Sequence, residues 1–166
     1  MDDKFLINIE PGLFEFLHWY RSNPPVWMTT QELADNGFPI NLDYKPVFTA
    51  SECLHQEVLK ENVSQYYERA HKVTSSIVDS FQGGLLFVAH ASSLDSNIRM
   101  MLNRDPPDDR EFYSFLDSIP YCSTSIIQEE DSNKWKFVKP LTGISHSANQ
   151  FHNYKKNFTS LGYSFK

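Results

Sequence analysis

His90 is the residue whose place in the sequence most favours chemistry. It follows Leu85–Ala89, an apolar run with the length and composition of a strand buried on both faces. The small residues Ala91, Ser92 and Ser93 come next and lead into a helix. Ligands of open α/β sheets bind beyond the carboxyl ends of the strands, where a helix N-terminus offers N–H groups and a favourable dipole to an anion. A protonated imidazole adds a donor, so this turn predicts a phosphate site.

Two other interpretations of the turn are open from position alone. A histidine that ends a buried strand can hydrogen-bond a carbonyl group and serve the fold only. A serine hydrolase would use Ser92 or Ser93 as its nucleophile on a strand–turn–helix, but the sequence lacks the Gly-x-Ser-x-Gly elbow of that class. The phosphate site and the structural histidine are therefore the interpretations to separate.

The composition describes a folded protein. The 166 residues favour one domain, and 40% hydrophobic with 14% aromatic residues exclude a disordered chain. A net charge of −6 argues against nucleic acid or an anionic membrane as the main partner. The sequence has neither a bilayer-spanning segment nor a signal peptide, so we expect a cytoplasmic protein in which Cys53 and Cys122 are reduced thiols. His146 and His152 lack a third ligand at convincing spacing, so we expect neither metal nor cofactor.

The elements that must position His90 alternate between helix and strand. The clearest is a helix over Asn62–Phe81, in which Tyr66, Ala70, Val73, Ile77 and Phe81 form one apolar stripe, and Gly83-Gly84 follow it. Helices alternating with a buried strand predict an α/β fold with a mainly parallel sheet. The other expected elements are a strand at Phe5–Ile9, helical turns at Leu13–Tyr20, helices at Thr30–Gly37, Asp95–Asn103 and Asp108–Leu116, and a hairpin of Tyr121–Gln128 with Trp135–Val138.

Several ordered motifs resemble one known family. The segment Val88–Leu94 resembles the second-histidine motif of the phosphoglycerate mutase-like histidine phosphatases. More narrowly, the chain is similar to the branch with the suppressors of T-cell receptor signalling and the insect ecdysteroid-phosphate phosphatases. The further matches to that branch are Ile9–Phe16 (its Glu-Pro-Gly-hydrophobic-Phe-Glu-Trp segment), Asp43–Pro46 (Tyr-Arg/Lys-Pro), Glu111–Tyr121 (ending in Ile-Pro), Trp135 and His146.

The resemblance implies a three-layer phosphoglycerate mutase-like fold and hydrolysis of phosphotyrosine or small phosphate monoesters without a cofactor. It implies that His90 is the second histidine, which contacts the phosphoryl oxygens and stabilises the transition state, with the Ala91 N–H on the same phosphate. The general acid falls on Glu15, with Glu10 as the fallback, because the leaving oxygen must be protonated. Without the resemblance, Glu15 is an ordinary exposed helical glutamate.

The chain departs from the family at the nucleophile. The family uses a different histidine in an Arg-His-Gly-Glu motif on the first strand, and none of the six histidines here follows an arginine. We therefore expect 1–166 to be a single partial domain, truncated at its N-terminus and lacking that strand. Arg21, Lys45 and Arg99 are unsupported replacements for the family's phosphate-binding arginines.

Two consequences follow for function. Without the nucleophile, the chain alone is expected to be inactive or very weak, because covalent catalysis is lost. The exposed sheet edge invites self-association. The alternatives are a non-catalytic relative, a pseudoenzyme that binds a phosphate ester, a phosphoprotein or another protein, and an incomplete product of an active phosphatase.

Overall fold

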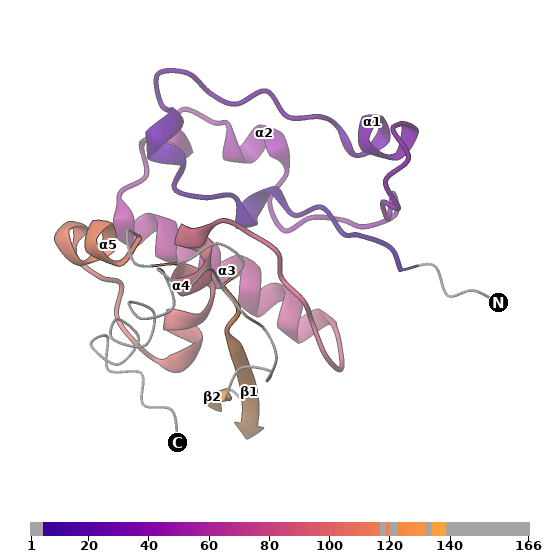
Figure 1. The fold of residues 1–166 in the computed structure, drawn as a ribbon. Helices are drawn as coiled ribbons and strands as arrows, with labels where there is room; N and C mark the ends of the chain where they lie inside the picture. Colours follow the sequence, from indigo (N-terminus) through magenta and orange to yellow (C-terminus); the bar gives the residue numbers. More distant parts are fainter. Residues whose placement is uncertain (1–4, 117–118, 120–122, 132–133, 139–166) are drawn as a thin grey trace.

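The computed structural model describes residues 5–116, 119, 123–131 and 134–138 (Figure 1). These residues mix helices with strands, as the α/β class requires. The 3-10 turns are η1 (Pro11–Leu13), η2 (Leu17–Tyr20), η3 (Val58–Lys60) and η4 (Met100–Leu102). The α-helices are α1 (Thr30–Asp35), α2 (Ala50–Cys53), α3 (Val63–Ser80), α4 (Ala91–Arg99) and α5 (Asp109–Leu116), and the strands are β1 (Ile126–Asp131) and β2 (Lys134–Val138).

Helix α3 forms where the sequence predicts it. Asn62 and Gln65 make a reciprocal capping box at its start, which satisfies N–H groups that the first turn leaves free. The expected stripe is buried from Tyr66 through Ile77. Phe81 was expected in the stripe, but it caps the helix in extended backbone and is 42% exposed. The helix ends at Ser80, so two residues separate it from the glycine pair at 83 and 84.

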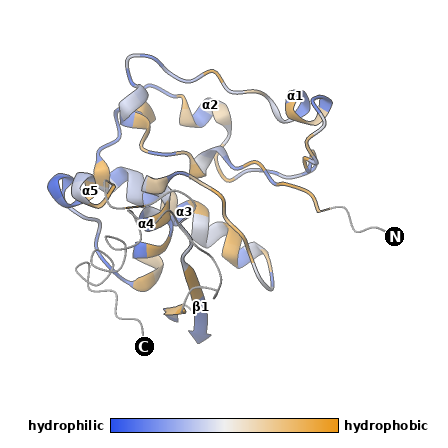
Figure 2. Ribbon diagram, viewed as in Figure 1, coloured by the Kyte–Doolittle hydropathy of each residue, from blue (hydrophilic) through white to orange (hydrophobic). Residues whose placement is uncertain are grey.

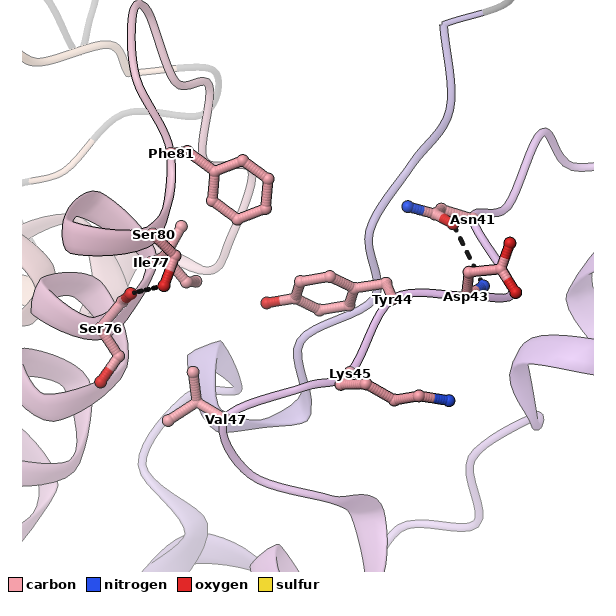
Figure 3. A pocket seen from close by; sticks show the side chains of 9 residues that line it. All are labelled: Asn41, Asp43, Tyr44, Lys45, Val47, Ser76, Ile77, Ser80 and Phe81. Carbon is pink, nitrogen blue, oxygen red and sulfur yellow. Dashed lines mark hydrogen bonds between the residues drawn. The ribbon is translucent and has the colours of Figure 1, made fainter.

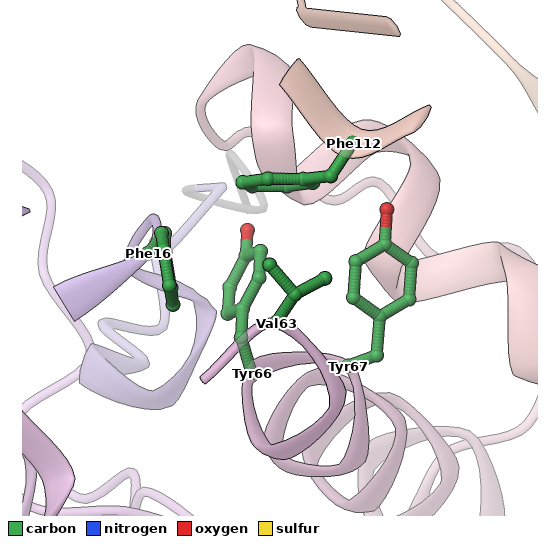
Figure 4. Packing of buried hydrophobic residues seen from close by; sticks show 5 residues of the cluster. All are labelled: Phe16, Val63, Tyr66, Tyr67 and Phe112. Atoms are coloured by element: carbon green, nitrogen blue, oxygen red, sulfur yellow. The ribbon is translucent and has the colours of Figure 1, made fainter. Parts of the chain in front are cut away.

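The main core lies where α3, α5 and the chain near η2 meet (Figure 4). The Phe112 ring contacts Phe16, Tyr66 and Tyr67 in edge-on geometry, with centroids 5.4 to 6.1 Å apart. Such contacts add to the stabilisation from burying the rings. Tyr66 and Tyr67 are both fully buried, so both are core residues.

The apolar run Leu85–Ala89 is not the buried strand that its composition predicts. It has no regular secondary structure, it pairs with no strand among the described residues, and Leu86 and Val88 are 77% and 85% exposed. Figure 2 shows this run as a hydrophobic stretch of the loop between α3 and α4. The expectation fails because a buried strand needs neighbours on both sides, and the described chain supplies none here. Helix α4 also begins at Ala91, earlier than the expected Asp95.

The strands that do form are few. β1 and β2 pair antiparallel as the expected hairpin, with Ile126 opposite Val138, although β1 starts and ends later than predicted. The expected strand at Phe5–Ile9 is reduced to one parallel bridge between Ile7 and Ile40. The described residues therefore do not themselves form the mainly parallel sheet. Among them, no helix has both the length and the apolar character to cross a membrane.

Candidate phosphate site

Glu15 lies on irregular backbone between η1 and η2. The sequence predicts helical turns over Leu13–Tyr20, but the structure has two 3-10 turns, with Phe14 in extended and Phe16 in irregular, non-helical backbone between them. Glu15 therefore lies outside both helical turns, and its side chain is only 16% exposed. Glu15 is therefore not the ordinary exposed helical glutamate of the alternative interpretation.

His90 faces Glu15 from the start of α4. His90 is the N-cap residue of that helix, and its carbonyl accepts the Ser93 N–H at 3.0 Å. Its Nδ1 lies 3.4 Å from Oε2 of Glu15, and its ring meets the edge of the Phe14 ring at 5.2 Å between centroids. The side chain is 48% exposed. Two residues 75 positions apart in the sequence are thus adjacent at one helix N-terminus.

Ala91 is exposed at the first position of α4. An N–H group at this position has no acceptor within its own helix, and it points out of the helix end with the positive end of the dipole. A protonatable ring, a carboxylate and an outward N–H group therefore share one surface. The ring and the N–H can bind phosphoryl oxygens, and the carboxylate can exchange a proton with an ester oxygen.

Tyr20 is a partner of Glu15 that the sequence alone did not reveal. Its hydroxyl donates to Oε1 of Glu15 at 2.5 Å, while Oε2 faces His90. This hydrogen bond, together with burial and the Glu15 charge, raises the pKa of Tyr20 to about 12. Phe14 packs against Tyr20 and Trp27, with centroids 5.4 and 4.9 Å away, and so builds an aromatic wall beside the site.

Glu10 has a different role from Glu15. Its two carboxylate oxygens accept four hydrogen bonds, from the N–H groups of Gly12, Val47 and Phe48 and from the Tyr44 hydroxyl. Burial and the Glu10 charge raise the pKa of Tyr44, which keeps that donor protonated. Glu10 thereby ties η1 to the loop before α2.

The two serines after His90 are structural groups. Both are buried, and both are within 3.2 Å of the Tyr66 hydroxyl on α3. Ser93 Oγ also donates to the Leu13 carbonyl at 3.0 Å. These bonds fix α4 against both α3 and the segment that carries Glu15, and they leave no role for Ser92 or Ser93 as an exposed nucleophile.

The three basic residues considered from sequence lie in other settings. Arg99 is buried and pairs with Asp95 and Glu111 at 2.7 and 3.1 Å. Lys45 lines an open pocket of about 390 Å³ between the loop near Tyr44 and the end of α3. Figure 3 shows the Tyr44 ring pointing toward α3 and the Lys45 side chain pointing away from it. Arg21 is exposed just after η2.

A buried ion pair is the main feature that sequence reasoning missed. Arg69 and Glu61 contact each other at 2.6 Å with side chains 4% exposed. Arg69 lies three residues after Tyr66 and four before Val73, on the apolar stripe of α3. A charged residue on a buried stripe is the signal that would have identified it, because such a charge needs a partner.

The described residues hold no group of three or more possible metal ligands. Cys53 is a free, buried thiol. The predictions for Cys122, His146 and His152 concern positions outside the described residues.

Comparison with known proteins identifies the family. No family model matches the chain. The chain is 40% identical over 147 residues to the ecdysteroid-phosphate phosphatase of Drosophila melanogaster, which covers 88% of this chain and 19% of that protein. It is 30% identical over 161 residues to human ubiquitin-associated and SH3 domain-containing protein A, covering 93% of this chain and 24% of that protein.

A structural comparison points to the same family. The crystal structure of the ecdysone phosphate phosphatase from Bombyx mori in complex with tungstate superposes with a TM-score of 0.63 at 25% identity. It covers 86% of this chain and 55% of that one, so the predicted α/β, phosphoglycerate mutase-like fold class is confirmed. The chain spans about a fifth to a quarter of the length of these curated relatives. It belongs to the branch of the histidine phosphatases that contains the ecdysteroid-phosphate phosphatases.

Proposed function

We propose that the chain carries part of a phosphate-monoester site, in which His90 and the Ala91 N–H bind the phosphoryl group and Glu15 exchanges the proton of the leaving oxygen. The observation that carries this proposal is the 3.4 Å separation of His90 Nδ1 and Glu15 Oε2 at the N-terminus of α4. An anion at this point gains charge-assisted hydrogen bonds and the helix dipole. The ligand class is a phosphate ester or phosphoprotein. The names of the relatives make a steroid phosphate one candidate.

The geometry supports Glu15 over Glu10 as the acid. A general acid must reach the substrate oxygen, and the four hydrogen bonds of Glu10 hold its carboxylate against the protein's own N–H and O–H groups. Glu15 has one oxygen on Tyr20 and one toward His90, with the side chain at the surface of the candidate site. Only Glu15 is therefore next to the place where a bound phosphate would sit.

These 166 residues are proposed to form one partial domain with negligible turnover of their own. No Arg-His-Gly triplet occurs in them, so they contain no counterpart of the family's nucleophile. Loss of one member of a cooperating catalytic unit lowers the rate by roughly 10⁴-fold or more. What remains is a phosphate-binding function, and it becomes catalytic only where a nucleophilic histidine is supplied from another segment or chain.

The exposed run Leu85–Ala89 supports self-association as a further property. It is exposed, uncharged and directly before the site, and an unpaired apolar segment of this kind can pair as a strand with another chain. A Val88→Lys variant places a charge on a residue of the run that is 85% exposed. Light scattering should detect a concentration-dependent dimer or oligomer in the wild type and less in this variant. Equal masses for the two proteins at all concentrations would contradict self-association through this run.

Two measurements test the phosphate site. Equilibrium dialysis with radiolabelled orthophosphate should show saturable binding that His90→Ala weakens about tenfold, as expected for losing one charge-assisted hydrogen bond of about 1.5 kcal/mol. The matched control is His55→Ala, an exposed histidine outside the site, which should bind as the wild type does. An aryl-phosphate assay should show no turnover above buffer. Robust turnover abolished by His90→Ala would refute the non-catalytic conclusion, and equal binding by both alanine variants would refute the site.

A further inference from the structure

The segment that presents Glu15 has backbone groups that its own turns do not satisfy. Phe14 is extended and Phe16 is also non-helical, so the carbonyls around them lack the partners that a continuous helix would give. Arg69 on α3 supplies the donors. Its Nη1 donates to the carbonyls of Gly12 and Phe14 at 2.7 and 3.0 Å, and its Nη2 donates to the carbonyl of Glu15 at 3.2 Å.

Glu61 holds the guanidinium in the orientation that these bonds require. Arg69 donates from Nε to Oε2 of Glu61 at 2.9 Å and from Nη2 to Oε1 at 2.6 Å, a two-point contact between a planar fork and a carboxylate. Oε1 also accepts the N–H of Leu17 at 2.8 Å. All five guanidinium N–H groups are thus used, and the pair holds the chain on both sides of Glu15.

Helix α3 connects this clamp to His90. Tyr66, one turn before Arg69, contacts Ser92 and Ser93 at the start of α4, and Ser93 donates to the Leu13 carbonyl. One rigid helix therefore fixes both the segment of Glu15 and the helix that His90 caps. Apolar side chains of the same volume often stabilise a fold as well as a buried ion pair does. The specific contribution of this pair is therefore the geometry that it imposes.

We propose that Arg69, oriented by Glu61, is a positioning residue that sets the separation of the Glu15 carboxylate and the His90 ring. The chemical meaning of that separation rests on the proposed function, whereas the clamp itself is a statement about geometry. Arg69 touches neither the ring nor the carboxylate, so it acts through the backbone. Lysine keeps the charge but cannot supply five donors in one plane.

The test is the ¹⁵N signal of His90 Nδ1, which reports contact with a carboxylate. Glu15→Gln defines the shift that follows when the charge is lost. Arg69→Lys should reproduce most of that shift, and the double variant should show little further change. The matched control is Arg99→Lys, which alters another buried, ion-paired arginine, so it should lower stability without moving the His90 signal. An unchanged His90 signal in folded Arg69→Lys, or equal changes in both arginine variants, would overturn the proposal.

Two further measurements keep the proposal testable if Arg69→Lys does not fold. Glu61→Gln retains an oxygen for the Leu17 N–H but removes the charge, and it should move the His90 signal in the same direction. In the wild type, the Leu17 amide should exchange with solvent as slowly as amides in the centre of α3, and fast exchange would contradict the clamp. Orthophosphate binding by the wild type is measured separately. A protein that does not bind phosphate refutes the proposed function, and the His90 signal still decides the positioning role.

Discussion

Replacement of Gly12 by alanine tests how tightly the segment of Glu15 is packed. A Cβ atom at this position would lie 2.6 Å from Cγ2 of Val73, 2.9 Å from Oε1 of Glu10 and 3.1 Å from Cδ2 of Phe48. Carbon atoms in contact prefer separations of about 3.5–4.0 Å, so Val73 or the turn must move by roughly 1 Å. Val73 is fully buried on α3, so the close-packed core around it opposes such a shift.

The expected cost combines two effects. Overpacking a well-filled core costs about 1–3 kcal/mol. The same Cβ pushes on the Glu10 carboxylate, whose weakened hydrogen bonds add about 1 kcal/mol. We therefore expect Gly12→Ala to lower the free energy of unfolding by about 2–4 kcal/mol, which corresponds to a drop in Tm of about 5–15 °C for a chain of this length.

The assay is urea unfolding followed by far-ultraviolet circular dichroism, with Gly84→Ala as the matched control. A Cβ at Gly84 would meet no atom within 4 Å, so that variant should unfold within about 0.5 kcal/mol of the wild type. If Gly12→Ala proved as stable as Gly84→Ala, the close approach of η1 to α3 would be refuted, and with it the packing that positions Glu15.

Three other perturbations test separate parts of the account. Burial raises the pKa of the Cys53 thiol to about 11, so only about 0.1% is thiolate at pH 8 and iodoacetamide should label the cysteine slowly until urea unfolds the chain; rapid labelling of folded protein would contradict its burial. Because the pKa of Tyr20 is raised above its unfolded value of 10.0, its hydrogen bond to Glu15 stabilises the fold below pH 10 and is lost as pH rises through about 12. The 295 nm titration should therefore show Tyr20 ionising nearer 10 in Glu15→Gln than in the wild type, and identical titrations would refute the contact. Tyr67→Phe removes a buried 2.8 Å hydrogen bond to the Asp95 carboxylate and should cost about 2 kcal/mol in urea unfolding, whereas no loss would show that this bond is not formed.

Local patterns predicted the elements that local forces determine. The predicted stripe from Tyr66 to Ile77 and the approximate bounds of α3 agree with the structure, because helical periodicity acts within a few residues. The buried strand and the full length of the stripe are two predictions that failed. The run at 85–89 has the composition of a buried strand, but burial depends on strands that pair with it, and no pattern in the run specifies them. Phe81 continues the stripe in sequence, yet the helix has already ended.

The residues of the candidate site differ in how far the sequence alone points to them. The position of His90 at the end of an apolar run and before a helix made it a candidate, with a purely structural role left open. Glu15 required the resemblance, because nothing local distinguishes it from a surface glutamate, and its contact with His90 joins positions 75 residues apart. Arg69 could have been singled out as a charge on the apolar stripe of α3, but the stripe does not identify its partners. Its role depends on three carbonyls of a turn more than fifty positions away, and no spacing rule relates them.

The most direct test of the central claim is a ¹H–¹⁵N titration of the protein with inorganic phosphate. The account predicts saturable shifts that are largest at the Ala91 amide and the His90 ring, that His90→Ala greatly weakens and that His55→Ala leaves unchanged. Shifts that do not saturate, that centre elsewhere, or that persist with the same affinity in His90→Ala would contradict a phosphate site at the start of α4.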